Sequence, residues 1–68
     1  MRYTIVIQYD EVDKIYIASV PELQGCMAHG RTQREALEEV STVYEMWMEE
    51  AEVQGREIPE PALFVHAG

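Results

Sequence analysis

The sequence contains few of the residues that build the common metal, redox and nucleic-acid sites. Its 68 residues include one cysteine, Cys26, so an internal disulfide is excluded and no set of cysteines is left for a structural zinc site. No adjacent base lowers the thiol pKa, so Cys26 is interpreted as a packed, unreactive residue. Five lysines and arginines stand against thirteen aspartates and glutamates, which gives a formal charge of −8. Because nucleic-acid binders need clustered positive charge, direct binding of DNA or RNA is not expected.

Long apolar runs are also missing. No stretch approaches the roughly 20 consecutive apolar residues of a membrane span, and no basic region followed by an apolar one marks a signal peptide. We therefore expect a cytoplasmic protein without a membrane partner. Residues 1–68 are expected to form one domain with a thin core, so self-association into a homodimer or higher homo-oligomer is expected as well.

Three segments in the first half of the chain have the pattern of β-strands. Apolar and polar residues alternate over Arg2–Tyr9, and Ile15–Val20 is rich in β-branched and aromatic side chains. The short polar segment between them predicts a hairpin, and Pro21 ends its ladder because proline has no N–H to donate. Gly25 is expected to take a positive φ in the following loop, and Cys26–Gly30 is long enough for a third strand.

One amphipathic helix is predicted after these strands. Thr32 and Glu35 have the spacing of a capping box, so the helix is expected to begin at Gln33, and Gly55 is well placed to end it. Apolar residues at helical spacing predict a stripe that packs on the sheet. The stripe consists of Ala36, Leu37, Val40, Val43, Tyr44, Trp47 and Ala51.

The end of the chain predicts a further strand. Ile58–Pro61 holds the backbone extended, and Ala62–His66 then has the composition of a short strand. The expected fold is α+β, with a three-stranded antiparallel meander, one amphipathic helix packed on one face and a short fourth strand, in the order β-β-β-α-β. A single helix covers only one face of such a sheet, so the other is left for solvent or a partner.

Residues with the chemistry of catalysis or metal binding are sparse. His29 and His66 belong to no ligand or nucleophile motif and are interpreted as ordinary surface or strand histidines. Asp10, Glu11 and Asp13 cluster at the hairpin tip and could in principle hold a hard cation, but they lack the EF-hand spacing and are more typical of a solvated turn. No catalytic, cofactor-binding or metal-binding residue is assigned, and an enzyme is not expected.

Charge and one exposed methionine instead indicate a protein partner. On a helical wheel Met46 falls between Glu35 and Glu39, and an exposed thioether among carboxylates is a modest sign of an interface. Negative charge suits docking onto a basic protein, although it also keeps a small protein soluble. The candidate partner-binding residues are Asp10, Glu11, Asp13, Glu35, Glu39, Met46 and Glu50.

Three motifs follow one another along the chain. They are the Pro-Glu-Leu-Gln-Gly-Cys within residues 16–26, the Gly-Arg-Thr-Gln-Arg-Glu-Ala start of the helix, and the Ile-Pro-Glu-Pro near the end. In this order and spacing, and over nearly the whole chain, the sequence resembles the HicB-like antitoxin family. The family motifs at Pro21, Gly25, Cys26, Thr32 and Glu35 carry over as positions that shape the fold.

The resemblance implies a partial ribonuclease-H-like fold that neutralises a small, basic, mRNA-cleaving toxin of the HicA type. Such an antitoxin covers the toxin surface that holds the catalytic histidine, and it needs no cofactor. Gln24 stands where the family often has a second proline. The family usually continues into a DNA-binding segment, whereas this sequence ends at Gly68, so autorepression through DNA is not expected.

Two alternatives stay open from the sequence. One is an orphan module that self-associates or binds a different protein. The other is a nuclease with Asp10 as a metal ligand, which only the analogy of fold suggests, since the complete acidic set of such an enzyme is missing.

Overall fold

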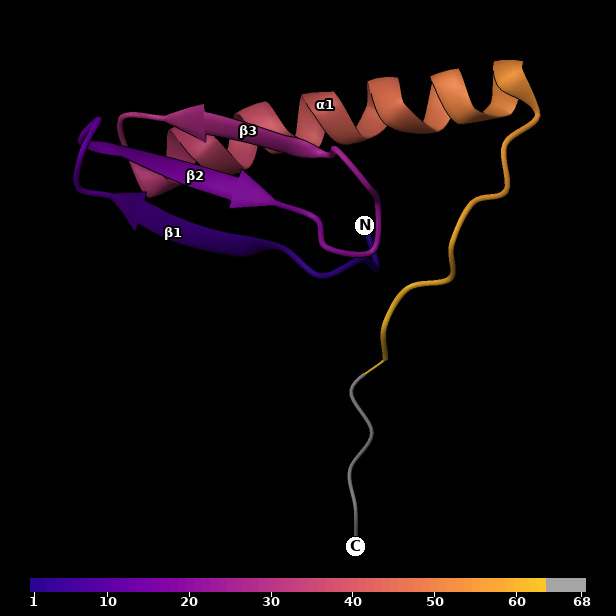
Figure 1. Cartoon of the computed structure of the whole chain (residues 1–68), viewed down its shortest axis with the longest axis horizontal. Helices are drawn as coiled ribbons and strands as arrows, with labels where there is room; N and C mark the ends of the chain where they lie inside the picture. The colour runs from indigo at the N-terminus through magenta and orange to yellow at the C-terminus, as the bar shows by residue number, and fades with distance from the viewer. Residues whose placement is uncertain (64–68) are drawn as a thin grey trace, which may run out of the picture.

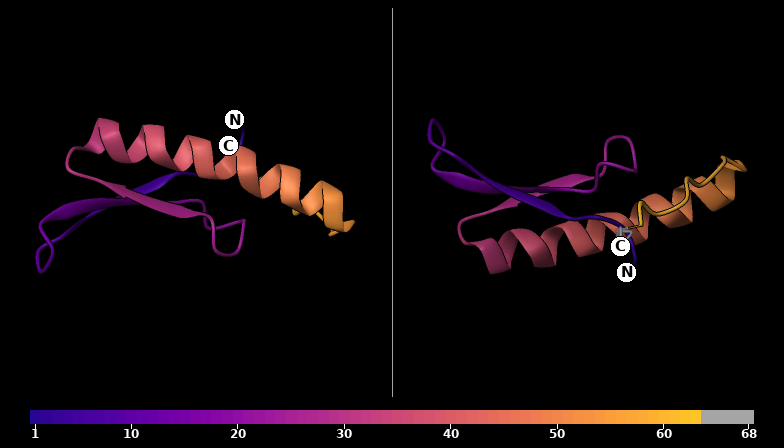
Figure 2. Two further views of the ribbon diagram at one scale, coloured as in Figure 1. Left: turned by 90° about the horizontal axis from the view of Figure 1, so that it is seen from above. Right: turned by 90° about the horizontal axis from the view of Figure 1, so that it is seen from below.

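A computed structural model describes residues 1–63 of the chain as three strands and one helix (Figure 1). The strands are β1 (Val6–Asp10), β2 (Ile15–Ser19) and β3 (Met27–Gly30), and they precede the helix α1 (Gln33–Gln54). The strands form one antiparallel sheet in the order β1-β2-β3, and α1 lies against one face of it (Figure 2). The predicted α+β fold, with a meander and one covering helix, is confirmed.

The register of the sheet determines which side chains face α1. Ile7 is paired with Ala18, and Ala18 with Ala28, so these three side chains lie on the covered face. Ile17 and His29, which pair one residue along, point to the opposite face. None of the elements formed by residues 1–63 covers that second face (Figure 2).

The core lies between the sheet, α1 and the loop that joins β2 to β3. Leu23, Val20 and Val40 are among its largest fully buried side chains. The loop is closed by a hydrogen bond of 2.9 Å from the Val20 amide to the Cys26 carbonyl, and Gly25 has the predicted positive φ, at 80°. Cys26 is buried, and this burial raises the pKa of its thiol, as expected for a packed cysteine.

Both ends of α1 agree with the sequence prediction. The Thr32 hydroxyl accepts a hydrogen bond of 3.0 Å from the Glu35 amide, and the helix begins at Gln33. Gly55 takes a left-handed conformation with φ 66°, and its amide donates to the Glu52 carbonyl at 3.2 Å. These local contacts satisfy backbone groups that a helix end otherwise leaves unpaired.

The extents predicted for the strands are wrong at one end of the sheet. β1 begins at Val6 and not at Arg2, β2 ends at Ser19, and β3 begins at Met27. Ser19 pairs with both Val6 and Met27, so it is the last rung of the sheet. Beyond it the chain turns into the loop at Pro21, which leaves no strand for residues 2–5 to pair with.

One member of the predicted apolar stripe does not pack as expected. Leu37 is 39% exposed, whereas Ala36, Val40 and Ala51 are fully buried. The helix packs mainly on β3 and β2 and contacts β1 much less. Leu37 lies at the edge of the stripe, so the covered face of the sheet shields it only partly.

The predicted fourth strand is not formed where the structure describes it. Ala62 and Leu63 are not in a strand, and the rest of the predicted range, residues 64–66, lies outside the described residues. The segment after α1 is instead attached by side chains, since the Tyr3 hydroxyl donates a hydrogen bond of 2.6 Å to the Pro59 carbonyl. The β-β-β-α part of the prediction therefore holds, and the final strand does not at Ala62 and Leu63.

Glu22 joins three segments that are far apart in the sequence. Its carboxylate accepts hydrogen bonds from the Ala62 amide at 2.9 Å, from the Thr4 amide at 3.0 and 3.2 Å, and from the Thr4 hydroxyl at 3.0 Å. The bond from Ala62, followed by that from the Thr4 amide, lowers the pKa of Glu22 to about 2. Sequence reasoning did not assign this role, because it depends on where the two termini lie.

Replacing Glu22 by glutamine is expected to lower the melting temperature at pH 7 and to flatten its dependence on acid. The folded-state pKa is about 2 against an ordinary value of 4.5, so the ionised carboxylate stabilises the fold above pH 4.5 and this stabilisation is lost as pH falls to 2. Melts followed by circular dichroism should therefore converge at the acid end. Glu38→Gln, at an exposed glutamate of α1, is the control, and identical pH profiles for the two variants would contradict the assigned role.

Candidate protein-binding surface

The helix α1 carries a large excess of negative charge. Arg34 is the only base among its 22 residues, and no basic residue occupies its last turn. Its glutamates all have exposed side chains. They are Glu35, Glu38, Glu39, Glu45, Glu49, Glu50 and Glu52.

This arrangement of acids opposes helix stability. Glu35 and Glu39 are four residues apart, as are Glu45 and Glu49, and like charges at that spacing destabilise a helix by a few tenths of a kcal/mol per pair. Glu52 lies in the last turn, where the helix dipole favours cations. Acid that weakens the helix is understandable if another molecule supplies the matching positive charge.

Four of the predicted partner-binding residues lie on one flank of α1, beside β3. Glu35 and Glu39 line a hollow of about 460 Å³ with residues of β3, and Met46 and Glu50 line a second hollow of about 440 Å³. Val43 lines both hollows, so the two are neighbours along the helix. We call this flank the β3-side seam. It consists of Glu35, Glu39, Val43, Met46, Glu50 and Val53.

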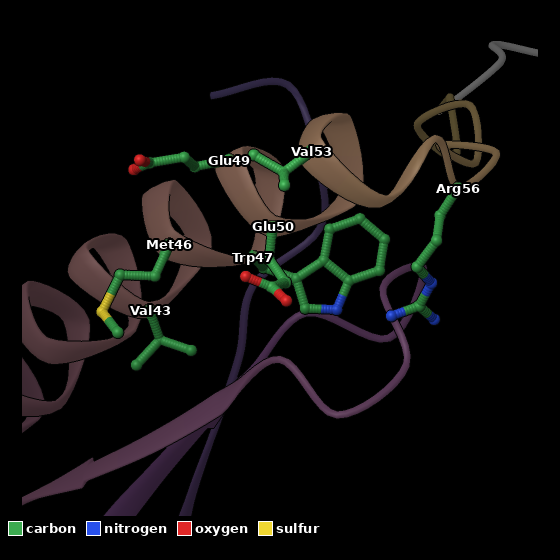
Figure 3. Close-up of a pocket in the computed structure, with 7 residues that line it drawn as sticks. All are labelled: Val43, Met46, Trp47, Glu49, Glu50, Val53 and Arg56. Carbon is green, nitrogen blue, oxygen red and sulfur yellow. The ribbon is translucent and has the colours of Figure 1, made fainter.

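The hollow at the C-terminal half of the seam combines an apolar floor with carboxylates. Figure 3 shows Val43, Met46 and Val53 projecting from α1, with the Glu50 carboxylate near Trp47. Met46 is 63% exposed and Val53 is 79% exposed. Apolar side chains with this much exposure on one flank are available to a partner.

Trp47 is held in a defined orientation at this hollow. Its indole Nε1 donates a hydrogen bond of 2.9 Å to the Gln24 carbonyl, and the ring is half-buried. The Arg56 guanidinium lies over the ring, 5.5 Å from the centroid. The prediction that Trp47 belongs to the packed stripe is confirmed, and the same ring also contributes to the surface hollow.

The other three predicted residues lie at the hairpin between β1 and β2. The Asp10 Oδ1 accepts hydrogen bonds from the amides of Val12 at 2.9 Å and Asp13 at 3.2 Å, so this carboxylate organises the turn. Glu11 and Asp13 are exposed. Figure 2 shows the hairpin curving away from α1, so the structure divides the predicted set into two groups.

The described residues contain no cluster suited to a metal ion. Within residues 1–63, no group of three or more histidine, cysteine, aspartate or glutamate side chains could hold one. His29 is exposed on β3, and His66 lies outside the described residues. The same part of the chain holds no helix with the length and apolar character of a membrane span.

Two seam residues were not predicted as partner-binding. Val43 was assigned to the packed stripe, and Val53 was not assigned at all. A signal for both was present, since Glu39, Val43, Met46, Glu50 and Val53 follow one another at alternating intervals of four and three residues. The search for a packed stripe used only the one that faces the sheet.

Comparison with known proteins gives the family. A family model described as the HicB_like antitoxin of bacterial toxin-antitoxin systems matches residues 3–66. The chain belongs to the HicB-like antitoxin family. This confirms the resemblance stated from the motifs, and it supports an antitoxin-type role for the HicB-like chain in general terms. A role of that type requires no catalytic residue.

Curated relatives of this HicB-like chain are UPF0150 proteins. It is 39% identical over 59 residues to one from Synechocystis sp., covering 87% of this chain and 80% of the relative. It is 36% identical over 59 residues to one from Thermoplasma acidophilum, covering 87% and 84%, and 37% identical over 49 residues to one from Archaeoglobus fulgidus, covering 72% and 70%. No solved structure gives a significant match.

Proposed function

We propose that this HicB-like chain neutralises a small, basic, mRNA-cleaving toxin of the HicA type by covering its active site. The uncompensated negative charge of α1 is the observation that carries the proposal. Inhibition by occlusion requires a surface of matching shape and charge, and it requires no reacting group or cofactor. In this proposal residues 1–68 act as a single domain in the cytoplasm, where the toxin meets mRNA, and the chain itself does not contact nucleic acid.

Binding of a basic protein would relieve the repulsion within α1. The glutamates that destabilise the free helix would each gain an opposite charge, and complementary fields would also speed encounter. Because exposed charges are screened by salt, the association rate is expected to fall as ionic strength rises. An acidic helix kept only for solubility would show no such partner-specific effect.

Protection of mRNA by the purified chain tests the proposal. The chain in excess is expected to stop cleavage by a HicA-type toxin from the same organism and to restore growth when the two are co-expressed. A variant with all glutamates of α1 changed to glutamine should fold, because these side chains are exposed, and should lose protection. Cleavage that continues unchanged with excess wild-type chain would contradict the proposal.

The uncovered face of the sheet favours a second role, self-association. Ile15 and Ile17 are only half-buried there, and Met27 is 58% exposed. Two copies meeting through this face would keep their acidic helices on opposite outer sides, so the repulsion between them is small. We propose a homodimer or higher homo-oligomer formed in this way, which would be the main role of an orphan module without a toxin. The strand residues of this face are Val6, Gln8, Asp10, Ile15, Ile17, Ser19, Met27 and His29, and only Asp10 carries a charge at pH 7.

Substituting lysine for Ile17 is expected to convert the oligomer to a monomer. A charge at the centre of an apolar contact must be desolvated without a partner, which opposes association. Light scattering coupled to gel filtration gives the mass directly. Gln54→Lys adds the same charge at the exposed end of α1 and should leave the mass unchanged, and a monomeric wild type would refute this mode of association.

A further inference from the structure

The β3-side seam has the spacing of a surface that packs against another helix. Glu39, Val43, Met46, Glu50 and Val53 alternate at intervals of four and three residues, which is the a/d pattern of paired helices. At about 100° per residue they fall within a stripe under about 90° wide. This stripe is distinct from the one that packs on the sheet, and Val43 lies at the boundary of the two.

The mixture of side chains on the seam defines the partner that fits it. We infer that the seam docks one amphipathic helix of a basic partner, whose apolar side chains contact Val43, Met46 and Val53 and whose bases face Glu39 and Glu50. The inference rests on the proposed function and specifies which element of the toxin the antitoxin binds. Eleven residues separate Glu39 from Glu50, or about 16 Å along a helix, so the two bases of the partner lie about three turns apart.

A second copy of this chain does not suit the seam. Antiparallel pairing about a two-fold axis between Val43 and Met46 would place Glu39 of one copy against Glu50 of the other, and the same contact would repeat on the other side of the axis. Parallel pairing would place each glutamate against its own equivalent. Both arrangements juxtapose carboxylates, and like charges across an interface select against a partner.

The chain already holds one cation at the end of the seam. Arg56 places its guanidinium 5.5 Å from the centroid of the Trp47 ring and lines the same hollow as Glu50 and Val53. An aromatic face beside a carboxylate is a favourable site for arginine, because it binds both the charge and the flat guanidinium. A basic side chain of a partner would meet the same combination of groups next to Met46.

A synthetic helical peptide provides the probe. It carries leucines at a/d spacing and two arginines eleven positions apart, and a control peptide has glutamates in place of the arginines. Trp47 is the only tryptophan of the chain and lies at the seam, so its fluorescence reports binding, with calorimetry as a second measurement. The arginine peptide is expected to bind, and the glutamate peptide is not.

Matched charge reversals locate the contact. Glu39→Lys and Glu50→Lys are each expected to weaken binding of the arginine peptide at least about tenfold, the size of loss that follows when a paired charge is reversed. Glu38→Lys and Glu45→Lys make the same change in net charge off the seam and are expected to weaken it less than about threefold. All four side chains are exposed, so the variants should fold, which circular dichroism verifies.

Each outcome has a distinct meaning. Equal losses on and off the seam, or no binding of the peptide to the wild type, would overturn the seam as a helix-docking surface. If the peptide fails while the chain still protects mRNA, the proposed function stands and the toxin is bound elsewhere. If binding depends on the seam but no HicA-type toxin is inhibited, the surface stands and the proposed function does not.

Discussion

Replacing Gly30 by alanine is expected to lower the free energy of unfolding by about 1–3 kcal/mol, the cost of overpacking a close contact. Gly30 ends β3 and is fully buried. A Cβ atom at this position would lie 2.5 Å from the Ala36 amide nitrogen and 2.8 Å from the Glu35 carbonyl carbon. Both are backbone atoms, so no rotation of a side chain relieves the clash, and β3 and the first turn of α1 must move apart.

Unfolding in urea, followed by circular dichroism, measures the effect. Arg31→Ala changes the exposed neighbour and is expected to alter stability by no more than about 0.5 kcal/mol. Separation of β3 from α1 would also deform the hollow that Glu35 and Glu39 line, so the Gly30 variant should bind a seam partner more weakly. Wild-type stability in Gly30→Ala would mean that β3 and α1 are not in such close contact.

Truncating Leu23 to alanine is expected to cost about 2–5 kcal/mol, because it leaves a cavity in a core that a small domain cannot easily repack. Leu23 is 1% exposed and is the largest fully buried side chain among the described residues. Its amide donates to the Val20 carbonyl and its carbonyl accepts from the Cys26 amide, both at 3.0 Å. The backbone around the cavity is therefore held in place and cannot collapse freely.

A graded set of variants distinguishes a packing effect from a general one. Leu63→Ala removes the same atoms from a side chain that is 66% exposed and should change the unfolding midpoint little. Leu23→Met keeps most of the volume and should cost less than about 1.5 kcal/mol. Equal losses for Leu23→Ala and Leu63→Ala would show that the loop between β2 and β3 does not carry the core.

Features governed by chemistry within one or two turns were predictable from the sequence. The Thr32 cap determines where α1 begins, and Gly25 and Gly55 take the positive φ that their positions require. The extents of the strands were less predictable. A strand lasts only as long as its partner, and the pairing of Ser19 with both neighbours ends the sheet at Val6.

The candidate site was predicted in part. The helical wheel placed Glu35, Glu39 and Met46 together, because helical neighbours are determined by spacing alone, and the structure finds them on one flank. The hairpin acids were grouped with them on charge alone. The structure separates Asp10 from that flank and uses its carboxylate in the turn.

The sequence by itself determined that a meander precedes one acidic, capped helix, and that a partner of opposite charge suits it. These properties follow from periodicity, caps and charge, which act over a few residues. Only the tertiary structure decided that β3 approaches α1 at Gly30, which flank of the helix stays open, and that Glu22 joins Thr4 to Ala62. Such contacts join residues far apart in the chain, so their energies depend on the whole fold and leave no pattern in any local segment.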